Sequence, residues 1–291
     1  MEKTIHLSHP GRYCAGLGDA VTWAWLANGS VPLSFWAEGR NREMLEFLGC
    51  RMADSPEGSI DPHDAYGKEL GERCGRPRAV IWSEFLGIPC EPKRPEFKLN
   101  QVGYLPRRVL LCPNTHFKPR EWPPAYWMDL NWKLRDANVD VVWLMEHQND
   151  LNQYSQRGPS MAYYGLSMRD CAALMSSAAV VVANDSMPAH LAGTVGRPTL
   201  AMMGPTHRNV FWHMPDVMPM HSEIVDCAGC HFGQPFRASC DMMCGALATL
   251  LPGDVAKTVL FILEKLNVAR RVSASVSADE AAKSRDQRRG A

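Results

Sequence analysis

The sequence has no excess of charge of either sign. Its 31 basic and 31 acidic residues give a formal net charge of zero. A chain without net charge has no long-range field that would gather nucleic acid or anionic lipid. We therefore expect no nucleic-acid partner, and a membrane could be contacted only peripherally, through a local basic patch.

The sequence also lacks long apolar runs. None approaches the roughly 20 residues that a helix needs to span a bilayer, and the N-terminal stretch MEKTIHLSHPGRYC has no secretory apolar core. We therefore expect a soluble, cytoplasmic protein. Hydrophobic residues make up 46% of the chain and charged residues 21%, which excludes a wholly disordered or fibrous chain. The length of 291 residues favours two domains of unequal size.

Structural disulfides are not predicted, because the cytosol keeps thiols reduced. Of the ten cysteines, six are scattered singly, and core packing explains most of these. The other four form two close pairs within 18 residues, namely Cys227, Cys230, Cys240 and Cys244. Four thiolates can complete a tetrahedral zinc shell, with His231 as a spare ligand, and such a shell would be structural because it has no open position. Buried metal-free thiols, or disulfides formed on oxidation, are the alternatives.

Residues 105–267 alternate short apolar runs with amphipathic segments. The apolar runs are VLLCP (109–113), VDVVWLM (139–145), AVVVAN (179–184) and PTLAMMG (198–204). The predicted helices lie between them: one over PAYWMDLNWKLRDAN, one opened by the capping box Ser167-x-x-Asp170, and one from about Pro188. These runs are too apolar to show an alternation of polar and apolar side chains. Such strands indicate a parallel sheet covered on both faces, as in a Rossmann-like α/β structure.

The N-terminal part is less regular. GLGDAVTWAWLANG predicts a glycine turn that leads into a helix, and VPLSFWAEG predicts the next strand, whereas residues 51–78 have the composition of irregular structure. The charged, proline-rich stretch CEPKRPEFKLNQVGYLPRR predicts a linker. We therefore predict an N-terminal domain over 1–100, a C-terminal domain over 101–268 that ends in the helix GDVAKTVLFILEKLN, and a disordered tail over 269–291.

Asp185 and Ser186 follow one apolar strand directly and precede a helix that is opened by Pro188. In open parallel sheets, ligands bind at this position, beyond the carboxyl ends of the strands. Free backbone N–H groups and the helix dipole favour a phosphate there, and His190 would lie in the first turn of the same helix. Ordinary helix capping by Asp185 and Ser186, and ordinary packing of His190, are the alternatives.

The stretch from Gly165 to Thr206 resembles the nucleotide-binding core of the family 9 glycosyltransferases, the heptosyltransferase group of lipopolysaccharide synthesis. In that family an Asp, a Thr or Ser, a Gly and a spaced His-Leu-Ala precede GxP and a closing GPT. This chain has Asp185-Ser186, His190-Leu191-Ala192, Gly196-Arg197-Pro198 and Gly204-Pro205-Thr206. It departs from the family at Met187, where glycine usually lets the backbone approach a diphosphate closely.

Three other stretches resemble the same family in the same order. In CPNTHFKPREWPPAYWMDL, Arg120 stands where the family has a lysine that contacts the donor phosphates, and Lys118 is close by. In YCAGLGDAVTW, Asp19 corresponds to the family's proposed general base, which takes the acceptor proton as the anomeric carbon is attacked. As a bare motif this turn is weak, because Asp19 could simply cap a helix. The cysteine pairs resemble a cysteine-rich segment before the family's last helix.

The resemblance implies a GT-B-like fold, with two Rossmann-like domains that face each other across a cleft and an N-terminal domain that is reduced. It implies inverting, metal-independent transfer of a heptose-type sugar from a nucleotide-diphosphate sugar to a hydroxyl of a glycan or lipid-linked acceptor, in lipopolysaccharide or other surface glycan synthesis. The phosphates would be held by Lys118, Arg120 and the donor-site residues of the strand ends, which are Asp185, Ser186, His190, Gly204 and Thr206. No cofactor would be required for catalysis.

Two further interpretations stay open at the level of the sequence. Met187 and the short N-terminal domain are also compatible with a catalytically inactive nucleotide-binding homologue that acts as a binding or assembly module. A third interpretation is an interaction protein built around a zinc-clasped loop, whose tail arginines contact an anionic partner. The tail charge is mixed, however, so a solvated end explains it equally well.

Overall fold

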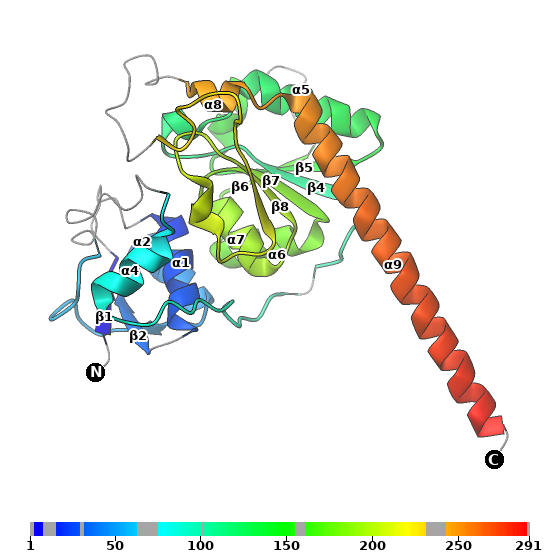
Figure 1. The fold of residues 1–291 in the computed structure, drawn as a ribbon, viewed down its shortest axis with the longest axis horizontal. Helices are drawn as coiled ribbons and strands as arrows, with labels where there is room; N and C mark the ends of the chain where they lie inside the picture. The colour runs from blue at the N-terminus through cyan, green and yellow to red at the C-terminus, as the bar shows by residue number, and fades with distance from the viewer. Residues whose placement is uncertain are drawn as a thin grey trace.

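The computed structural model of the chain describes residues 3–7, 16–29, 32–62, 75–100, 102–154, 161–230 and 243–289. It is an α/β structure with two parallel sheets (Figure 1). The N-terminal sheet has the order β1-β2-β3, formed by Lys3–His6, Leu33–Trp36 and Arg51–Met52. Its helices are α1 (Leu17–Ala27), α2 (Gly39–Phe47) and α4 (Arg78–Leu86). The predicted turn-helix and the strand that follows it are thus α1 and β2, whereas α2 and α4 were not predicted.

The C-terminal sheet contains six parallel strands within the described residues. They are β4 (Arg108–Cys112), β5 (Asp140–Met145), β6 (Ala162–Tyr164), β7 (Val180–Asn184), β8 (Thr199–Met202) and β9 (Val217–Met220). Their spatial order is β6-β5-β4-β7-β8-β9. This is the Rossmann order, in which the direction of winding switches between the first and the fourth strand, here β4 and β7. The prediction of a Rossmann-like parallel sheet is confirmed.

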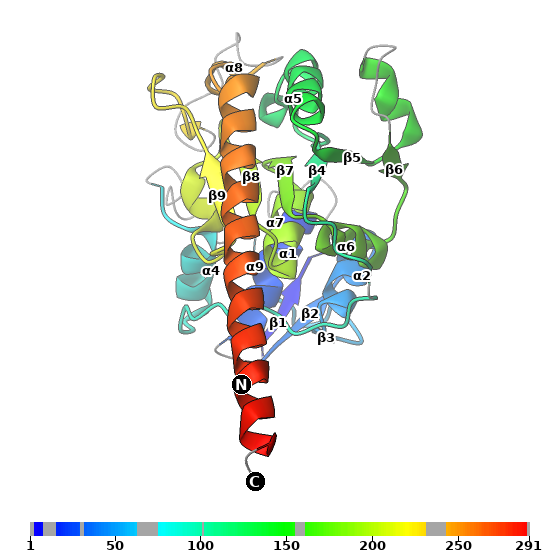
Figure 2. The same cartoon turned by 90° about the vertical axis from the view of Figure 1, so that its right-hand side faces the viewer.

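Helices cover both faces of the C-terminal sheet. They are α5 (Pro124–Asp136), α6 (Met168–Ser177), α7 (Met187–Val195), α8 (Gly245–Ala248) and α9 (Pro252–Arg289). Short 3-10 helices are η2 (Lys118–Arg120), η3 (Gln148–Gln153) and η4 (Arg208–Phe211). Helices α5 and α9 lie side by side on one face, and α6 and α7 cover the other (Figures 1 and 2). As predicted, Ser167 caps α6 by accepting from the Asp170 N–H at 3.1 Å.

The two domains share one hydrophobic core rather than touching only at their surfaces. Helices α6 and α7 pack against α1 and α2, and buried residues from both domains belong to the same cluster. Hydrogen bonds cross the junction as well: among them, Trp25 Nε1 donates to Thr194 Oγ1 at 2.8 Å, and the Met168 N–H donates to Glu43 Oε1 at 2.8 Å. Because α1 packs against α7 in this shared core, the position of the start of α1 relative to the start of α7 is fixed.

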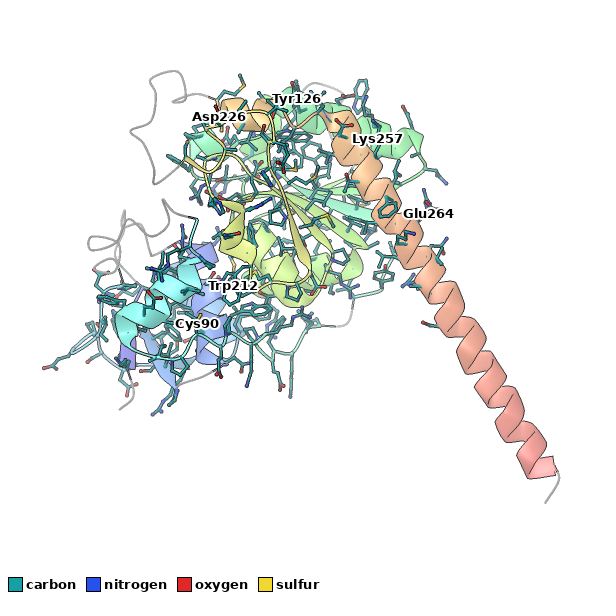
Figure 3. All side chains as sticks on the ribbon, in the orientation of Figure 1. Cys90, Tyr126, Trp212, Asp226, Lys257 and Glu264 are labelled. Carbon is teal, nitrogen blue, oxygen red and sulfur yellow. The ribbon has the colours of Figure 1, made fainter. Side chains whose placement is uncertain are left out.

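The end of the chain differs from its prediction. Disorder is predicted for 269–291, whereas α9 continues to Arg289 and extends away from the larger domain (Figure 1). Lys257 and Glu264 lie on the part of α9 that is beside the larger domain (Figure 3). The tail contains no glycine or proline before Gly290 and is rich in alanine and charged helix formers. The low apolar content of the tail argues against its packing on the domain, but it does not argue against the formation of a helix.

Candidate functional site

A cavity of about 980 Å³ lies between the two domains. On the side of the larger domain it is lined by Asn114, which follows β4, and by Asp185 and Ser186, which follow β7. The cavity therefore lies at the switch point of the Rossmann-like sheet, where such sheets bind ligands. From the N-terminal domain it is lined by the start of α1, including Asp19, and by Arg78 at the start of α4.

Asp185 and Arg120 form an ion pair at the floor of this cavity. Arg120 Nε lies 3.2 Å from Asp185 Oδ2, and the carboxylate is only 2% exposed. Burial alone would raise the pKa of Asp185, but the Arg120 guanidinium, with contributions from Thr206, His190 and Arg78, holds that pKa below its ordinary value. The pair is charged at neutral pH. Since a guanidinium has five N–H donors, Arg120 keeps donors for a phosphate as well.

The start of α7 lines the cavity. Helix α7 begins at Met187, so that Pro188 occupies the second helical position and supplies no N–H. The Ala189 N–H donates to the Ser186 carbonyl at 3.0 Å. The Met187 N–H is therefore the first-turn donor available to a phosphate. The Met187 side chain packs against the core shared by the two domains.

The Ser186 hydroxyl is used differently from its prediction. It donates to the backbone carbonyl of Asn114 at 3.0 Å, which ties the start of α7 to the end of β4. Asn114 itself accepts from the Glu146 N–H at 3.2 Å and donates to Asp150 at 3.0 Å. Asn114 was not singled out from the sequence. The available signal was its place directly after an apolar strand, the same kind of position that identified Asp185.

His190 is buried and lies against Gly18 of the N-terminal domain. A Cβ on Gly18 would lie 2.8 Å from His190 Cδ2, so glycine is required there. Burial lowers the pKa of His190 to about 3, although Asp185 opposes this shift. The imidazole is thus neutral at physiological pH. Among the described residues its Nδ1 has no hydrogen-bond partner.

Asp19 lies on the opposite wall, in the first turn of α1. Its side chain is buried, its Oδ2 accepts from the Gly16 N–H at 3.1 Å, and its Oδ1 forms an ion pair with Arg78 Nη1. Arg78 was missed in the sequence, where residues 51–78 read as irregular. Pro77 directly before it is the N-cap of α4, and this helix-start signal could have drawn attention to it.

Three other predicted donor-site residues are placed as follows. Thr206 is buried and lines the cavity. Lys118 does not line it: its exposed amine pairs with Glu121 at 2.9 Å. Gly204 does not line it either, because its α-carbon faces α8 and a Cβ there would lie 2.8 Å from Leu247 Cγ. The structure thus brings Asp19, Arg120, Asp185, Ser186, His190 and Thr206 to one cavity, but neither Lys118 nor Gly204.

The predicted metal site is only partly covered by the structure. Cys240 and the spare ligand His231 lie outside the described residues. Cys227 and Cys230 share a turn and are half-buried, and Cys244 is the buried N-cap of α8. Within the part of the chain that the structure describes, no three His, Cys, Asp or Glu side chains converge on a metal position.

Two Rossmann-like domains that face each other across a cavity define a GT-B-like glycosyltransferase fold. The sequence profile of glycosyltransferase family 9 (heptosyltransferase) matches residues 83–230. The chain belongs to this family and is a glycosyltransferase. The matched range includes the donor-side residues Arg120, Asp185 and His190, and it begins after Asp19.

Solved structures share the fold at low sequence identity. E. coli ADP-heptose LPS heptosyltransferase II is 12% identical with a TM-score of 0.55, covering 90% of this chain and 99% of that one. E. coli heptosyltransferase WaaC with ADP-2-deoxy-2-fluoro heptose is 12% identical with a TM-score of 0.58, covering 89% and 99%. The dodecameric iron-containing heptosyltransferase TibC of enterotoxigenic E. coli, in complex with ADP-D-beta-D-heptose, is 14% identical with a TM-score of 0.64, covering 92% and 76%.

A comparison with curated proteins gives no match. None of the described helices combines the length and the apolar composition that crossing a membrane requires.

Proposed function

We propose that this glycosyltransferase transfers a sugar from a nucleotide-diphosphate sugar to an acceptor hydroxyl, with inversion at the anomeric carbon. The observation that carries the proposal is the composition of the cavity. One wall supplies a carboxylate, Asp19, and the other supplies a phosphate-binding set, Arg120 and the start of α7. Because WaaC and TibC have structures with ADP-linked heptose donors, we expect an ADP-linked, heptose-type sugar here as well.

The donor diphosphate would lie at the carboxyl end of β7. The Met187 N–H and the dipole of α7 would bind one phosphate, and the Arg120 guanidinium, held by Asp185, would bind the other. These groups would stabilise the charge that develops on the departing nucleoside diphosphate. Neutral His190 would contribute a hydrogen bond without adding charge.

The acceptor would enter from the N-terminal domain. Its hydroxyl oxygen would attack the anomeric carbon on the face opposite the diphosphate, and Asp19 would take the hydroxyl proton. The bond between the anomeric carbon and the phosphate oxygen would break, and the nucleoside diphosphate would leave with the electron pair. This single displacement inverts the anomeric carbon and needs no metal or cofactor. A glycan or lipid-linked acceptor in lipopolysaccharide or other surface glycan synthesis, in the cytoplasm, fits this chemistry.

The experiment is turnover with a panel of nucleotide sugars that begins with ADP-heptose, followed by NMR of the product anomer. We expect one donor to react, the anomeric configuration to be inverted, and the rate to be the same with and without EDTA. A product that retains the donor configuration would contradict the single displacement. A rate abolished by EDTA and restored by a divalent cation would contradict the metal-independent mechanism.

We also propose that Cys227, Cys230, Cys240 and Cys244 hold a structural zinc ion. Their two close pairs fit the spacing of tetrahedral thiolate sites. Elemental analysis of protein purified under reducing conditions should find about one zinc per chain, and iron should be measured in parallel because TibC is iron-containing. Cys230→Ser should lose the metal, whereas Cys90→Ser, at a half-buried cysteine outside the cluster, should keep it. Metal-free wild-type protein with full stability would refute this site.

A further inference from the structure

Asp19 and Arg78 form a buried ion pair between two helix starts of the N-terminal domain. The Asp19 side chain is 6% exposed and the Arg78 side chain 10%. Asp19 lies in the first turn of α1, and Arg78 is the first residue of α4. Both residues also line the cavity between the domains. A buried charge pair is costly to desolvate and is weak support for stability by itself, so its place in the cavity wall calls for a functional explanation.

The two oxygens of the Asp19 carboxylate are held from different sides. Oδ2 accepts from the Gly16 N–H at 3.1 Å, and Oδ1 accepts from Arg78 Nη1. The first contact belongs to the helix start and would be present in any helix with an acid at this position. The second comes from a separate helix and fixes the plane of the carboxylate. The same carboxylate lines the cavity, where an acceptor hydroxyl would approach it.

The charge of Arg78 also reaches the donor side of the cavity. Its guanidinium contributes to the lowered pKa of Asp185 and to the lowered pKa of His190. On the donor side of the pair the charged and titratable groups are Asp185, Arg120 and the neutral His190. The same cavity is also lined by further titratable side chains, which are Glu38, Arg40, Glu43, His116, Glu146, His147 and Cys171.

We propose that Arg78 is the positioning residue of this glycosyltransferase, which holds the Asp19 carboxylate ionised and oriented toward the acceptor hydroxyl. This inference rests on the proposed role of Asp19 as the base. It assigns to Arg78 an effect on proton transfer, beyond the packing of α4 against α1. A guanidinium next to a carboxylate favours the ionised form, so the base stays active at lower pH than it would alone.

The test compares Arg78→Met and Arg78→Lys with the wild type in transfer rate, donor binding and pH profile. For Arg78→Met we expect kcat/KM to fall by about 100-fold and its acid limb to move to higher pH, because the carboxylate then holds its proton more tightly. For Arg78→Lys, which keeps the charge but not the fork geometry, we expect an unchanged acid limb and a partial loss of rate. Guanidinium ion should restore part of the activity of Arg78→Ala. Calorimetric donor binding should be within a few-fold of the wild type throughout.

Arg76→Ala is the matched control. Arg76 lies two residues before Arg78 in the sequence, but it pairs with Glu84 at the surface. It should leave rate and pH profile unchanged. A wild-type rate and acid limb in Arg78→Met would overturn the proposal. If Arg78→Met does not fold, Arg78→Lys still tests the proposal, because lysine contacts the Asp19 carboxylate with a different geometry. A wild-type rate in Arg78→Lys would then overturn the proposal. Full transfer by Asp19→Asn would instead show that the proposed base is wrong, which separates the two failures.

Discussion

Replacement of Asp19 by asparagine is expected to remove sugar transfer while donor binding stays intact. Asparagine has the same shape and can still accept from the Gly16 N–H through its amide oxygen. It cannot take a proton from the acceptor hydroxyl, so we expect kcat to fall by about 10²- to 10⁴-fold. In the proposed site the donor phosphates would be held by the other domain, at Arg120 and α7, so donor affinity should not change. Single-turnover kinetics and calorimetry with a nucleotide sugar measure the two effects separately.

The control for this variant is Asp254→Asn. Asp254 is also an acid in the first turn of a helix, but it lies on the exposed start of α9, where it pairs with Lys257. This variant should transfer at the wild-type rate. Asp19→Asn removes the counter-charge of buried Arg78, so this variant should also be less stable than the wild type. Its kinetics should therefore be measured well below its melting temperature. Wild-type turnover by Asp19→Asn would refute the assignment of the base.

Replacement of Arg120 by methionine is expected to weaken donor binding strongly and to destabilise the larger domain. Loss of a charged, two-pronged phosphate contact should weaken donor binding by about 100-fold. Asp185, which is 2% exposed, would be left without its main counter-charge. Removal of one partner of such a buried pair costs about 3–5 kcal/mol. Calorimetry measures the first effect and chemical denaturation the second.

The stability effect of Arg120→Met should depend on pH. In the wild type the pKa of Asp185 is below its ordinary value of 3.8, so its contribution to stability is present above that value and is lost only as the pH falls through the folded-state pKa. In the variant burial dominates and raises this pKa, so protonation relieves the buried charge. The deficit relative to the wild type should therefore shrink as the pH is lowered from about 7 to about 4.

Two variants control for this prediction. Lys118→Met removes a neighbouring cation whose amine pairs with Glu121 at the surface, and it should change neither donor binding nor stability. Arg120→Lys keeps the charge beside Asp185 and should recover most of the stability, with weaker donor binding because the fork is lost. Weakened donor binding in Lys118→Met, with normal binding in Arg120→Met, would reverse the assignment of the phosphate contact.

The fold was predictable where burial is continuous. The strands β4, β5, β7 and β8 are covered on both faces and therefore appear in the sequence as apolar runs. The edge strands β6 and β9 are short and partly exposed, and β9 contains Pro219, so neither is recognisable as a buried strand in the sequence. The helix over the tail was not predicted, because its low apolar content indicates only that the tail does not pack against the domain. A helix can form without such packing.

The site was predictable where a residue follows a strand or stands in a family motif. Asp19, Arg120, Asp185 and His190 come from four separate stretches, and the structure brings them to one cavity. Motif position does not determine side-chain direction, which is why Lys118 and Gly204 were predicted at the site and lie away from the cavity. The ion pair of Asp19 with Arg78 joins residues 59 apart in the sequence, and no local pattern signals such a contact.

The central claim is that the cavity between the domains binds the diphosphate of a nucleotide-sugar donor. Calorimetric titration of the wild-type chain with nucleoside diphosphates, beginning with ADP, and with the corresponding nucleosides tests it most directly. We expect one diphosphate to bind with a stoichiometry of about one per chain and its nucleoside to bind far more weakly, because the phosphates supply the charged contacts. Absence of binding by every nucleoside diphosphate at millimolar concentration would contradict it.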